Sequence, residues 1–190
     1  MLSGDGTVYY YGKIFTIAES NEYFHALFHN IPWKNDEVII FGKHIITKRK
    51  TAWYGDSNYV YVYSNMIKQA LSWTRELAGL KHIVEKLVNT KFNSCLLNLY
   101  HDGNEGVGWH SDSEKSVQEN SPIASVSFGA ERRFSFKHKQ SRKSISILLE
   151  HGSLLLMKDT TQKNWLHSLP KSKTITQPRI NLTFRQMVPN

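Results

Sequence analysis

The sequence predicts an α+β protein in which two helices and a hairpin precede an all-β C-terminal half, folded as a sandwich or a barrel-like jelly roll. Helical periodicity occurs only before about residue 90. After Lys91 the chain is almost entirely short strand-like runs separated by loops rich in Gly, Ser, Asp and Asn, a pattern typical of these architectures. The 190 residues are enough to bury a core without disulfides or a structural metal, so we expect one domain over 1–190.

Two amphipathic helices are expected to pack on a sheet, because apolar residues form a stripe with helical periodicity in two segments. In "SNEYFHALFHNI" these residues are Phe24, Leu27, Phe28 and Ile31. In "WTRELAGLKHIVEKLVNT" they are Leu77, Leu80, Val84 and Leu87. Ser20 is expected to cap the first helix through its hydroxyl oxygen.

The strands are predicted from runs of β-branched residues and from residues that alternate between the two faces of a strand. "EVIIFGKHIITKRK" holds two such runs joined at Gly42 and Lys43, and glycine at the first position of a two-residue loop suits a type II′ hairpin. In "NYVYVYS" three tyrosines alternate along one face. The remaining predicted strands are "FNSCLLNLY", "IASVSFG", "RFSFKHK", "SISILLE", "SLLLMK" and "RINLTFR".

The last of these strands places four polar side chains on one edge, namely Arg179, Asn181, Thr183 and Arg185. With a period of two, all four project from the same face. One interpretation is a surface strand whose polar side faces water. The other is a site for an anion, since arginine pairs with a carboxylate through two hydrogen bonds and stays charged.

The chain carries a net charge of +8, and the positive residues are clustered. The clusters are Lys48–Lys50, Glu131–Lys143 and Lys171–Lys173. Such runs are either solvated faces or, beside aromatic residues, the electrostatic signature of a nucleic-acid binder.

Compartment and membrane association are bounded by two observations. A single cysteine, Cys95, excludes an internal disulfide and fits a reducing compartment. No basic start precedes an apolar run, and no apolar run reaches the roughly 18 residues of a membrane span. We expect an intracellular monomer without membrane contact, cytoplasmic in a bacterium and nuclear in a eukaryote.

The segment "GVGWHSDSE" carries the strongest chemical signal. His110, Asp112 and Glu114 are two residues apart, so in an extended segment they point to one side, and His167 follows in "NWLHSLP". Two histidines and one carboxylate form the facial triad of non-haem Fe(II) oxygenases. Zinc is the alternative metal, but the two-arginine strand supplies what an oxygenase needs for an acidic co-substrate.

Six motifs together extend this interpretation: "NLY", "WHSDSE", "SVSFGAERRFSF", "HGSLLLM", "WLHSLP" and "PRINLTFR". Their order and spacing resemble those of the AlkB-type Fe(II)/2-oxoglutarate dioxygenases, from about Pro32 to Pro189. The resemblance implies a double-stranded β-helix (jelly-roll) core over about 91–190. It also implies that about 1–90 holds the N-terminal helices and a nucleotide-recognition hairpin and lid.

The resemblance assigns roles to the residues of these motifs. His110, Asp112 and His167 match the iron ligands. Arg179 matches the partner of the distal carboxylate of 2-oxoglutarate and Arg185 that of the metal-proximal carboxylate. The further co-substrate contacts that it implies are Asn98, Tyr100 and Asn181.

The implied activity is oxidative DNA dealkylation, with Fe(II), 2-oxoglutarate and O2 as cofactors and co-substrates. N-methyl groups of 1-methyladenine and 3-methylcytosine would be hydroxylated and lost as formaldehyde, with release of succinate and CO2. The alternatives are a related oxygenase acting on RNA or protein, and a nucleic-acid binder without catalysis.

A target base must be extruded or already unpaired, and the resemblance implies the residues that receive it. Tyr63 and the His110 ring would sandwich the base, Tyr61 would donate a hydrogen bond, and Glu114 would lie near the exocyclic amine. The alternative for the two tyrosines is an ordinary core-facing position. A carboxylate suits both lesions, because they are cationic.

Phe41 lies at the expected tip of the hairpin, beside a basic stretch. An apolar side chain there can enter the base stack and fill the gap left by a flipped nucleotide; the alternative is a buried phenylalanine. "VIIFGKHIITKRKTAWYGD" resembles the duplex-acting relatives, whereas "TAWYG" and "WHSDSE" equally resemble the relatives that prefer single strands. The segment favours double-stranded DNA, with single-stranded DNA and RNA as the alternatives.

Overall fold

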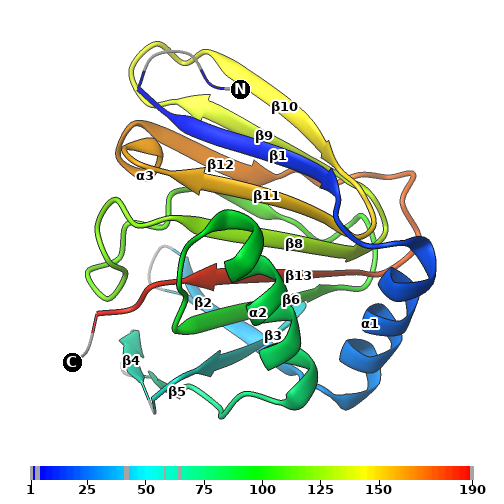
Figure 1. The fold of residues 1–190 in the computed structure, drawn as a ribbon. Coiled ribbons are helices and arrows are strands. Elements are labelled where there is room, and N and C mark those ends of the chain that lie inside the picture. Colours follow the sequence, from blue (N-terminus) through cyan, green and yellow to red (C-terminus); the bar gives the residue numbers. More distant parts are fainter. Residues whose placement is uncertain (1, 3–4, 41–42, 58, 64–65, 189–190) are drawn as a thin grey trace.

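The computed structural model describes the chain except residues 1, 3–4, 41–42, 58, 64–65 and 189–190. Two β-sheets face each other, and two helices cover the outer face of the larger sheet (Figure 1). The larger sheet has seven strands in the order β1-β11-β8-β13-β6-β3-β2, and the smaller has four in the order β10-β9-β12-β7. This is a jelly-roll core, as the sequence predicts.

Strands of the larger sheet are β1 (Thr7–Lys13), β2 (Lys34–Ile40), β3 (Lys43–Gly55), β6 (Ser94–Tyr100), β8 (Ile123–Gly129), β11 (Ser153–Lys158) and β13 (Arg179–Arg185). Those of the smaller sheet are β7 (Val107–His110), β9 (Arg132–His138), β10 (Ser144–Leu149) and β12 (Trp165–Leu169). A separate two-stranded ribbon pairs β4 (Val60–Tyr63) with β5 (Met66–Gln69). Three strands of the larger sheet precede residue 56, so this sheet crosses the predicted division near residue 90.

Helix α1 (Ile17–Asn30) begins earlier than the sequence analysis predicts. Thr16, not Ser20, is the N-cap: its hydroxyl accepts from the Glu19 amide, and the Glu19 carboxylate accepts from the Thr16 amide. This reciprocal pair satisfies two of the amides that a helix start leaves free. Ser20 is instead fully buried one turn into the helix.

Helix α2 (Arg75–Val88) is capped by Thr74 and ends at Asn89 in the left-handed conformation. Leu77, Leu80 and Val84 are fully buried, as predicted. Leu87 is 45% exposed, so its assignment to the buried stripe is wrong. It lies in the last turn, where Val88 rather than Leu87 packs against the core. A short third helix, α3 (Thr161–Asn164), precedes β12.

The hairpin of β2 and β3 is shifted by one residue from the predicted loop. Ile40 pairs with Lys43, so Lys43 begins the second strand, and residues 41–42 connect the two. Both connecting residues, Phe41 among them, lie outside the described part of the chain.

The strict alternation of β13 separates two environments. Ile180, Leu182 and Phe184 are fully buried and belong to the core between the larger sheet and the helices. The polar residues of the strand face the smaller sheet instead. At the other end of this inter-sheet space a second apolar cluster, which includes Phe136 and Trp165, closes the interior.

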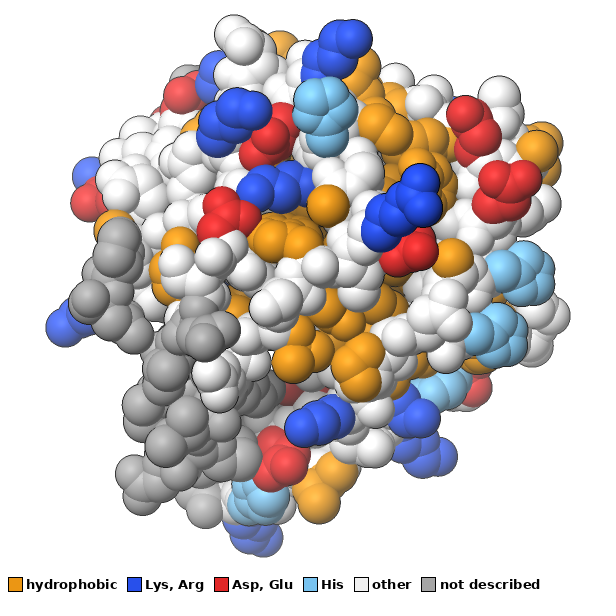
Figure 2. All heavy atoms as spheres, turned by 60° about the horizontal axis from the view of Figure 1, so that its bottom comes forward, with side chains coloured by type: hydrophobic (Ala, Val, Ile, Leu, Met, Phe, Trp, Pro, Cys, Tyr) orange, Lys and Arg blue, Asp and Glu red, His pale blue; other side chains and the backbone are white. Residues whose placement is uncertain are grey.

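Charged and apolar side chains are mixed on the surface. Figure 2 shows the face at the bottom of Figure 1, where Lys and Arg are scattered among hydrophobic and acidic side chains. Among the described residues, every helix is too short or too polar to cross a membrane.

Candidate active site

Three side chains that could ligate a metal meet between the sheets. His110 at the end of β7 pairs in register with His167 of β12, and Asp112 follows two residues after β7. The potential ligand atoms of the three all lie within 4.8 Å of one another. His110 Nε2 is 4.0 Å from Asp112 Oδ1. Strand pairing thus brings together residues that are far apart in the sequence.

Both histidines are held in states that suit metal binding. The Nδ1 of His110 lies 2.9 Å from the Gly108 carbonyl oxygen. Since a carbonyl only accepts, Nδ1 carries the proton and Nε2 keeps its lone pair for a ligand. His167 is 4% exposed, and burial lowers its pKa to about 4 although the charge of Asp112 opposes this shift. Its imidazole is therefore neutral at physiological pH.

Asp112 remains ionised although it is buried. Burial alone would raise its pKa, but the interactions with neighbouring groups, led by the charge of Arg185, outweigh burial and lower it. Arg185 Nη2 donates to Asp112 Oδ1 at 2.8 Å. The Asp112 amide donates to Gln162 Oε1 at 2.9 Å, which fixes the backbone. A charged carboxylate beside two imidazoles is the donor set of the facial triad that binds Fe(II).

The polar edge of β13 forms a buried ladder with β8. Arg179 Nη2 donates to Ser127 Oγ at 2.9 Å, and Asn181 Nδ2 donates to Ser125 Oγ at 2.8 Å. Thr183 Oγ1 donates to Asn181 Oδ1 at 3.1 Å. The polar residues of β13 therefore line an internal cavity, and the alternative of a solvated strand edge is wrong.

Two arginine nitrogens in this cavity point to an anionic ligand. The Nε atoms of Arg179 and Arg185 are buried and have no hydrogen-bond partner among the described residues. Burial lowers the pKa of Arg179 to about 10, and the neighbouring Tyr100 opposes this shift. A carboxylate in the cavity would satisfy these donors and relieve the cost of the buried charge.

One cavity of about 230 Å³ joins the metal cluster to the ladder. Its walls include every predicted iron and co-substrate residue, namely Asn98, Tyr100, His110, Asp112, His167, Arg179, Asn181 and Arg185. Glu114 lies both on this cavity and on a second cavity of about 770 Å³ beside it. The predicted site residues that the structure describes are thus brought together.

Three predicted substrate contacts fall outside this description. Phe41 is not among the described residues. Tyr61 and Tyr63 belong to β4, but their side chains lie outside the described part. The roles predicted for these three remain predictions.

Several residues of the site were not predicted from the sequence. Ser125 and Ser127 alternate in β8, so the period of two in "SVSF" could have placed them on one face; they pair with Thr183 and Asn181 of β13. Arg49 lines the small cavity and forms an ion pair with Asp36, which is 6% exposed. For Asp36 and Gln162 the sequence offers no signal, because only tertiary contacts bring them here.

The donor set and the two buried arginines fit Fe(II) together with a dicarboxylate. A jelly roll that carries this triad beside an arginine-lined cavity defines an Fe(II)/2-oxoglutarate-dependent oxygenase. Comparison with known proteins agrees: a model of the 2OG-Fe(II) oxygenase superfamily matches residues 7–185.

Similar proteins narrow the family. "DNA oxidative demethylase ALKBH2" of Homo sapiens is 39% identical over 189 residues, which span 94% of this chain and 72% of the relative. The protein of the same name in Mus musculus is 37% identical over 99% of this chain and 83% of the relative. "Alpha-ketoglutarate-dependent dioxygenase alkB homolog 3" of Bos taurus is 37% identical over 92% of this chain and 64% of the relative. The solved structure of OsALKBH1 shares the fold with a TM-score of 0.66 at 14% identity, over 98% of each chain.

The chain belongs to the AlkB-type Fe(II)/2-oxoglutarate dioxygenases. Its cofactors and co-substrates are accordingly Fe(II), 2-oxoglutarate and O2. When bound, these groups supply the oxidation, in which 2-oxoglutarate becomes succinate and CO2 and a substrate C–H bond is hydroxylated. The protein's own residues bind, orient and exclude water.

Proposed function

We propose that this protein removes N-methyl groups from DNA bases, with 1-methyladenine and 3-methylcytosine as substrates and formaldehyde as the product. The observation that carries the proposal is the 37–39% identity to relatives named DNA oxidative demethylase, across nearly the whole chain. Hydroxylation of the N-methyl carbon gives a hemiaminal, which collapses to formaldehyde and the unmodified base. We also propose an intracellular location, where such DNA is found.

The wider cavity supports a base as the substrate. At about 770 Å³ it has room for a nucleotide, and it shares Glu114 and Arg185 with the cavity of the metal cluster. A carboxylate at this junction favours a cationic base. We propose that Glu114 contacts the exocyclic amine, and that Tyr61, Tyr63 and the His110 ring hold the base.

The outer face of β7 supports contact with a nucleic-acid strand. Trp109, the neighbour of His110, is 42% exposed, and the Lys137 Nζ lies 4.2 Å from its ring centroid. Lys139 donates to Ser111 on the same edge at 3.4 Å. An indole for stacking beside lysines for phosphates is a combination used on single strands and flanking nucleotides.

Turnover decides the proposal directly. The protein is incubated with Fe(II), 2-oxoglutarate and oligonucleotides that carry 1-methyladenine, in DNA and in RNA, and methyl loss is measured by mass spectrometry. We expect loss from DNA, abolished by Asp112→Ala and retained in the exposed control Glu22→Ala. Loss from RNA alone, or from neither, contradicts the proposal. DNA affinity that survives in Asp112→Ala separates binding from catalysis.

We further propose that double-stranded DNA is the preferred substrate and that Phe41 occupies the gap left by the flipped base. Phe41→Ala should then depress turnover on duplex far more than on single strands. Ile46→Ala is the matched control, because Ile46 is 63% exposed on β3 of the same hairpin. Equal losses on both substrates would point to a structural role for Phe41.

A further inference from the structure

A buried arginine stands beside the co-substrate cavity without lining it. Arg132 begins β9 and is 1% exposed. Its guanidinium donates to backbone carbonyl oxygens, at 3.2 Å to Asp102, 2.8 Å to Glu105 and 2.9 Å to Pro170. A guanidinium is costly to bury, so a position that keeps one in contact with neutral carbonyls indicates a specific role.

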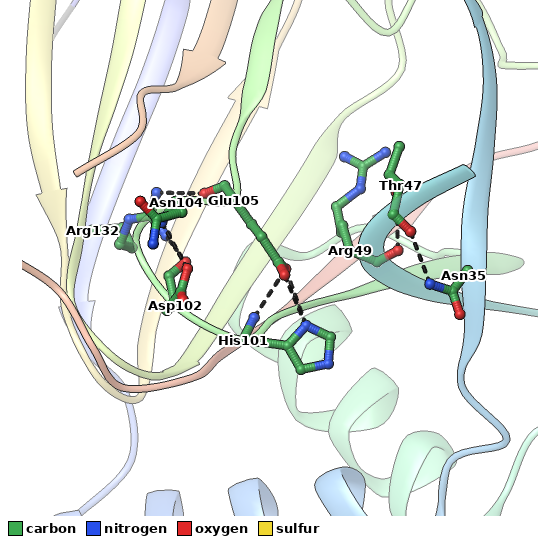
Figure 3. Close-up of polar contacts among 8 residues, drawn as sticks. All are labelled: Asn35, Thr47, Arg49, His101, Asp102, Asn104, Glu105 and Arg132. Carbon is green, nitrogen blue, oxygen red and sulfur yellow. Dashed lines mark hydrogen bonds and ion pairs between the residues drawn. The ribbon is translucent and has the colours of Figure 1, made fainter. Parts of the chain in front are cut away.

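These carbonyls belong to segments that carry site residues. Asp102 and Glu105 lie between β6, which ends at Tyr100, and β7, which ends at the proposed ligand His110. Pro170 directly follows β12, which carries His167. Arg132 thus ties three strands of the site together at one end. Figure 3 shows its guanidinium directed at the 102–105 turn.

The turn is itself well ordered by hydrogen bonds. The Glu105 carboxylate accepts from the His101 amide at 3.0 Å and contacts His101 Nδ1 at 2.9 Å. The Asn104 amide donates to Asp102 Oδ1 at 2.8 Å (Figure 3). The carbonyls that Arg132 binds are therefore fixed, and a movement of Arg132 would be transmitted to the end of β6.

Tyr100 connects Arg132 to the co-substrate cavity. Its ring centroid is 5.9 Å from the guanidinium carbon of Arg132 and 5.4 Å from that of Arg179, both within the range of cation–π attraction. The positive charge of Arg132 also adds to burial in lowering the pKa of Arg179. Two guanidinium groups thus share one aromatic ring at the arginine end of the cavity.

We propose that Arg132 is a positioning residue for 2-oxoglutarate. It holds the ring of Tyr100 and the ends of β6 and β12, so that Tyr100 and Arg179 meet the distal carboxylate of the co-substrate. Its charge raises the positive potential at that carboxylate. The proposal rests on the family chemistry and is independent of whether DNA is the substrate.

The adjacent arginine provides a matched control. Arg133 is exposed on the outer face of the same strand. We prepare the Zn(II) forms of Arg132→Met, Arg132→Lys, Arg133→Met and the unmodified protein. The Kd of 2-oxoglutarate is measured for each by titration calorimetry. Arg132→Met should weaken binding about tenfold or more, Arg132→Lys less, and Arg133→Met not at all. The kinetic counterpart is a raised KM for 2-oxoglutarate with kcat changed far less.

A second ligand separates positioning from general loss of structure. 2-Oxovalerate keeps the 2-oxo acid but lacks the distal carboxylate, so its Kd should change little in Arg132→Met. The preference for 2-oxoglutarate over 2-oxovalerate should shrink. An unchanged preference, with only a lower Tm, overturns the proposal. If Arg132→Met fails to fold, Arg132→Lys decides: it keeps the charge but not the forked contacts, and an unchanged Kd for 2-oxoglutarate refutes the positioning role.

Discussion

At His167, burial and metal binding make the same demand on one imidazole. Burial lowers its pKa from 6.5 to about 4, with the charge of Asp112 opposing the shift. A metal ligand must offer a lone pair, which only the neutral ring has. The fold therefore supplies the ligand in its binding form, at a cost in stability when the pH falls.

That cost is measurable in the metal-free protein. Between pH 6.5 and 4 the unfolded chain binds a proton at His167 that the folded chain does not, so the free energy of unfolding falls with pH in this window, by about 2 kcal/mol between pH 7.5 and 5. His167→Asn should flatten this part of the profile, as measured by urea unfolding. His29→Asn, at an exposed position of α1, is the control. Parallel profiles for His167→Asn and the unmodified protein would contradict the prediction.

Cys95 gives a second prediction at this scale. Its side chain is fully buried in the core between the larger sheet and the helices, and burial raises the pKa of the thiol strongly. Because the thiolate is the reactive form, iodoacetamide should leave the native protein unmodified for hours and label it within minutes in urea. Mass spectrometry of the intact chain reads the result. Rapid labelling of the native protein would show that the core opens locally.

Among the elements, the contact between the loop at Gly103 and the loop from Ser172 to Ile175 depends on a glycine. The Gly103 amide donates to the Ile175 carbonyl, and the Ser172 amide donates to the Gly103 carbonyl, both at 2.8 Å. A Cβ on Gly103 would lie 2.2 Å from the Ser172 carbonyl oxygen, so backbone would have to move. The two loops precede β7 and β13, and their fit therefore bears on the whole site.

Gly103→Ala should destabilise the protein by about 1–3 kcal/mol, the usual cost of overpacking, and raise the KM for 2-oxoglutarate. Gly79→Ala is the matched control. Gly79 lies in α2 with open space around its Cβ position, so alanine should stabilise by about 0.5–1 kcal/mol through helix propensity. Urea unfolding compares the two. A neutral Gly103→Ala would mean that the loops are free to separate.

Sequence periodicity located most elements but not their ends. The alternation of "RINLTFR" and the stripe of α2 were sufficient, because one face of each is apolar and packs in the core. Thr16 and Glu19 form an N-capping pair that the sequence displays, yet the apolar stripe that begins at Phe24 favours Ser20 as the cap. Strand β1 was not predicted, since its burial depends on pairing with β11, far along the chain.

The site was predictable to the extent that motifs carry it. His110, Asp112, His167 and the arginines of β13 belong to such motifs, and the structure places them on one cavity. Arg132 lies on the same face of its strand as Phe134 and Phe136, so alternation alone indicates that it points inward. What it contacts there could not be predicted, because its partners are backbone carbonyls, which no sequence pattern marks.

For the whole molecule, the net charge of +8 implies that DNA binding depends on salt. Each phosphate neutralised contributes about −0.9 to the slope of log K against log salt on duplex. Lys137→Gln should reduce the magnitude of this slope by about one, because Lys137 lies on Trp109 beside the site. Lys86→Gln, at an exposed position of α2, should leave the slope unchanged. Fluorescence anisotropy from 50 to 300 mM salt measures the slope, and identical slopes would remove Lys137 from the interface.

The pairing of His110 with His167 across β7 and β12 has a consequence for folding. The two ligands come from distant parts of the chain and meet only when β7 pairs with β12 in the smaller sheet. A chain in which these two strands have not paired therefore offers no complete metal site. Metal binding by this set of ligands therefore reports that the smaller sheet has formed this pairing.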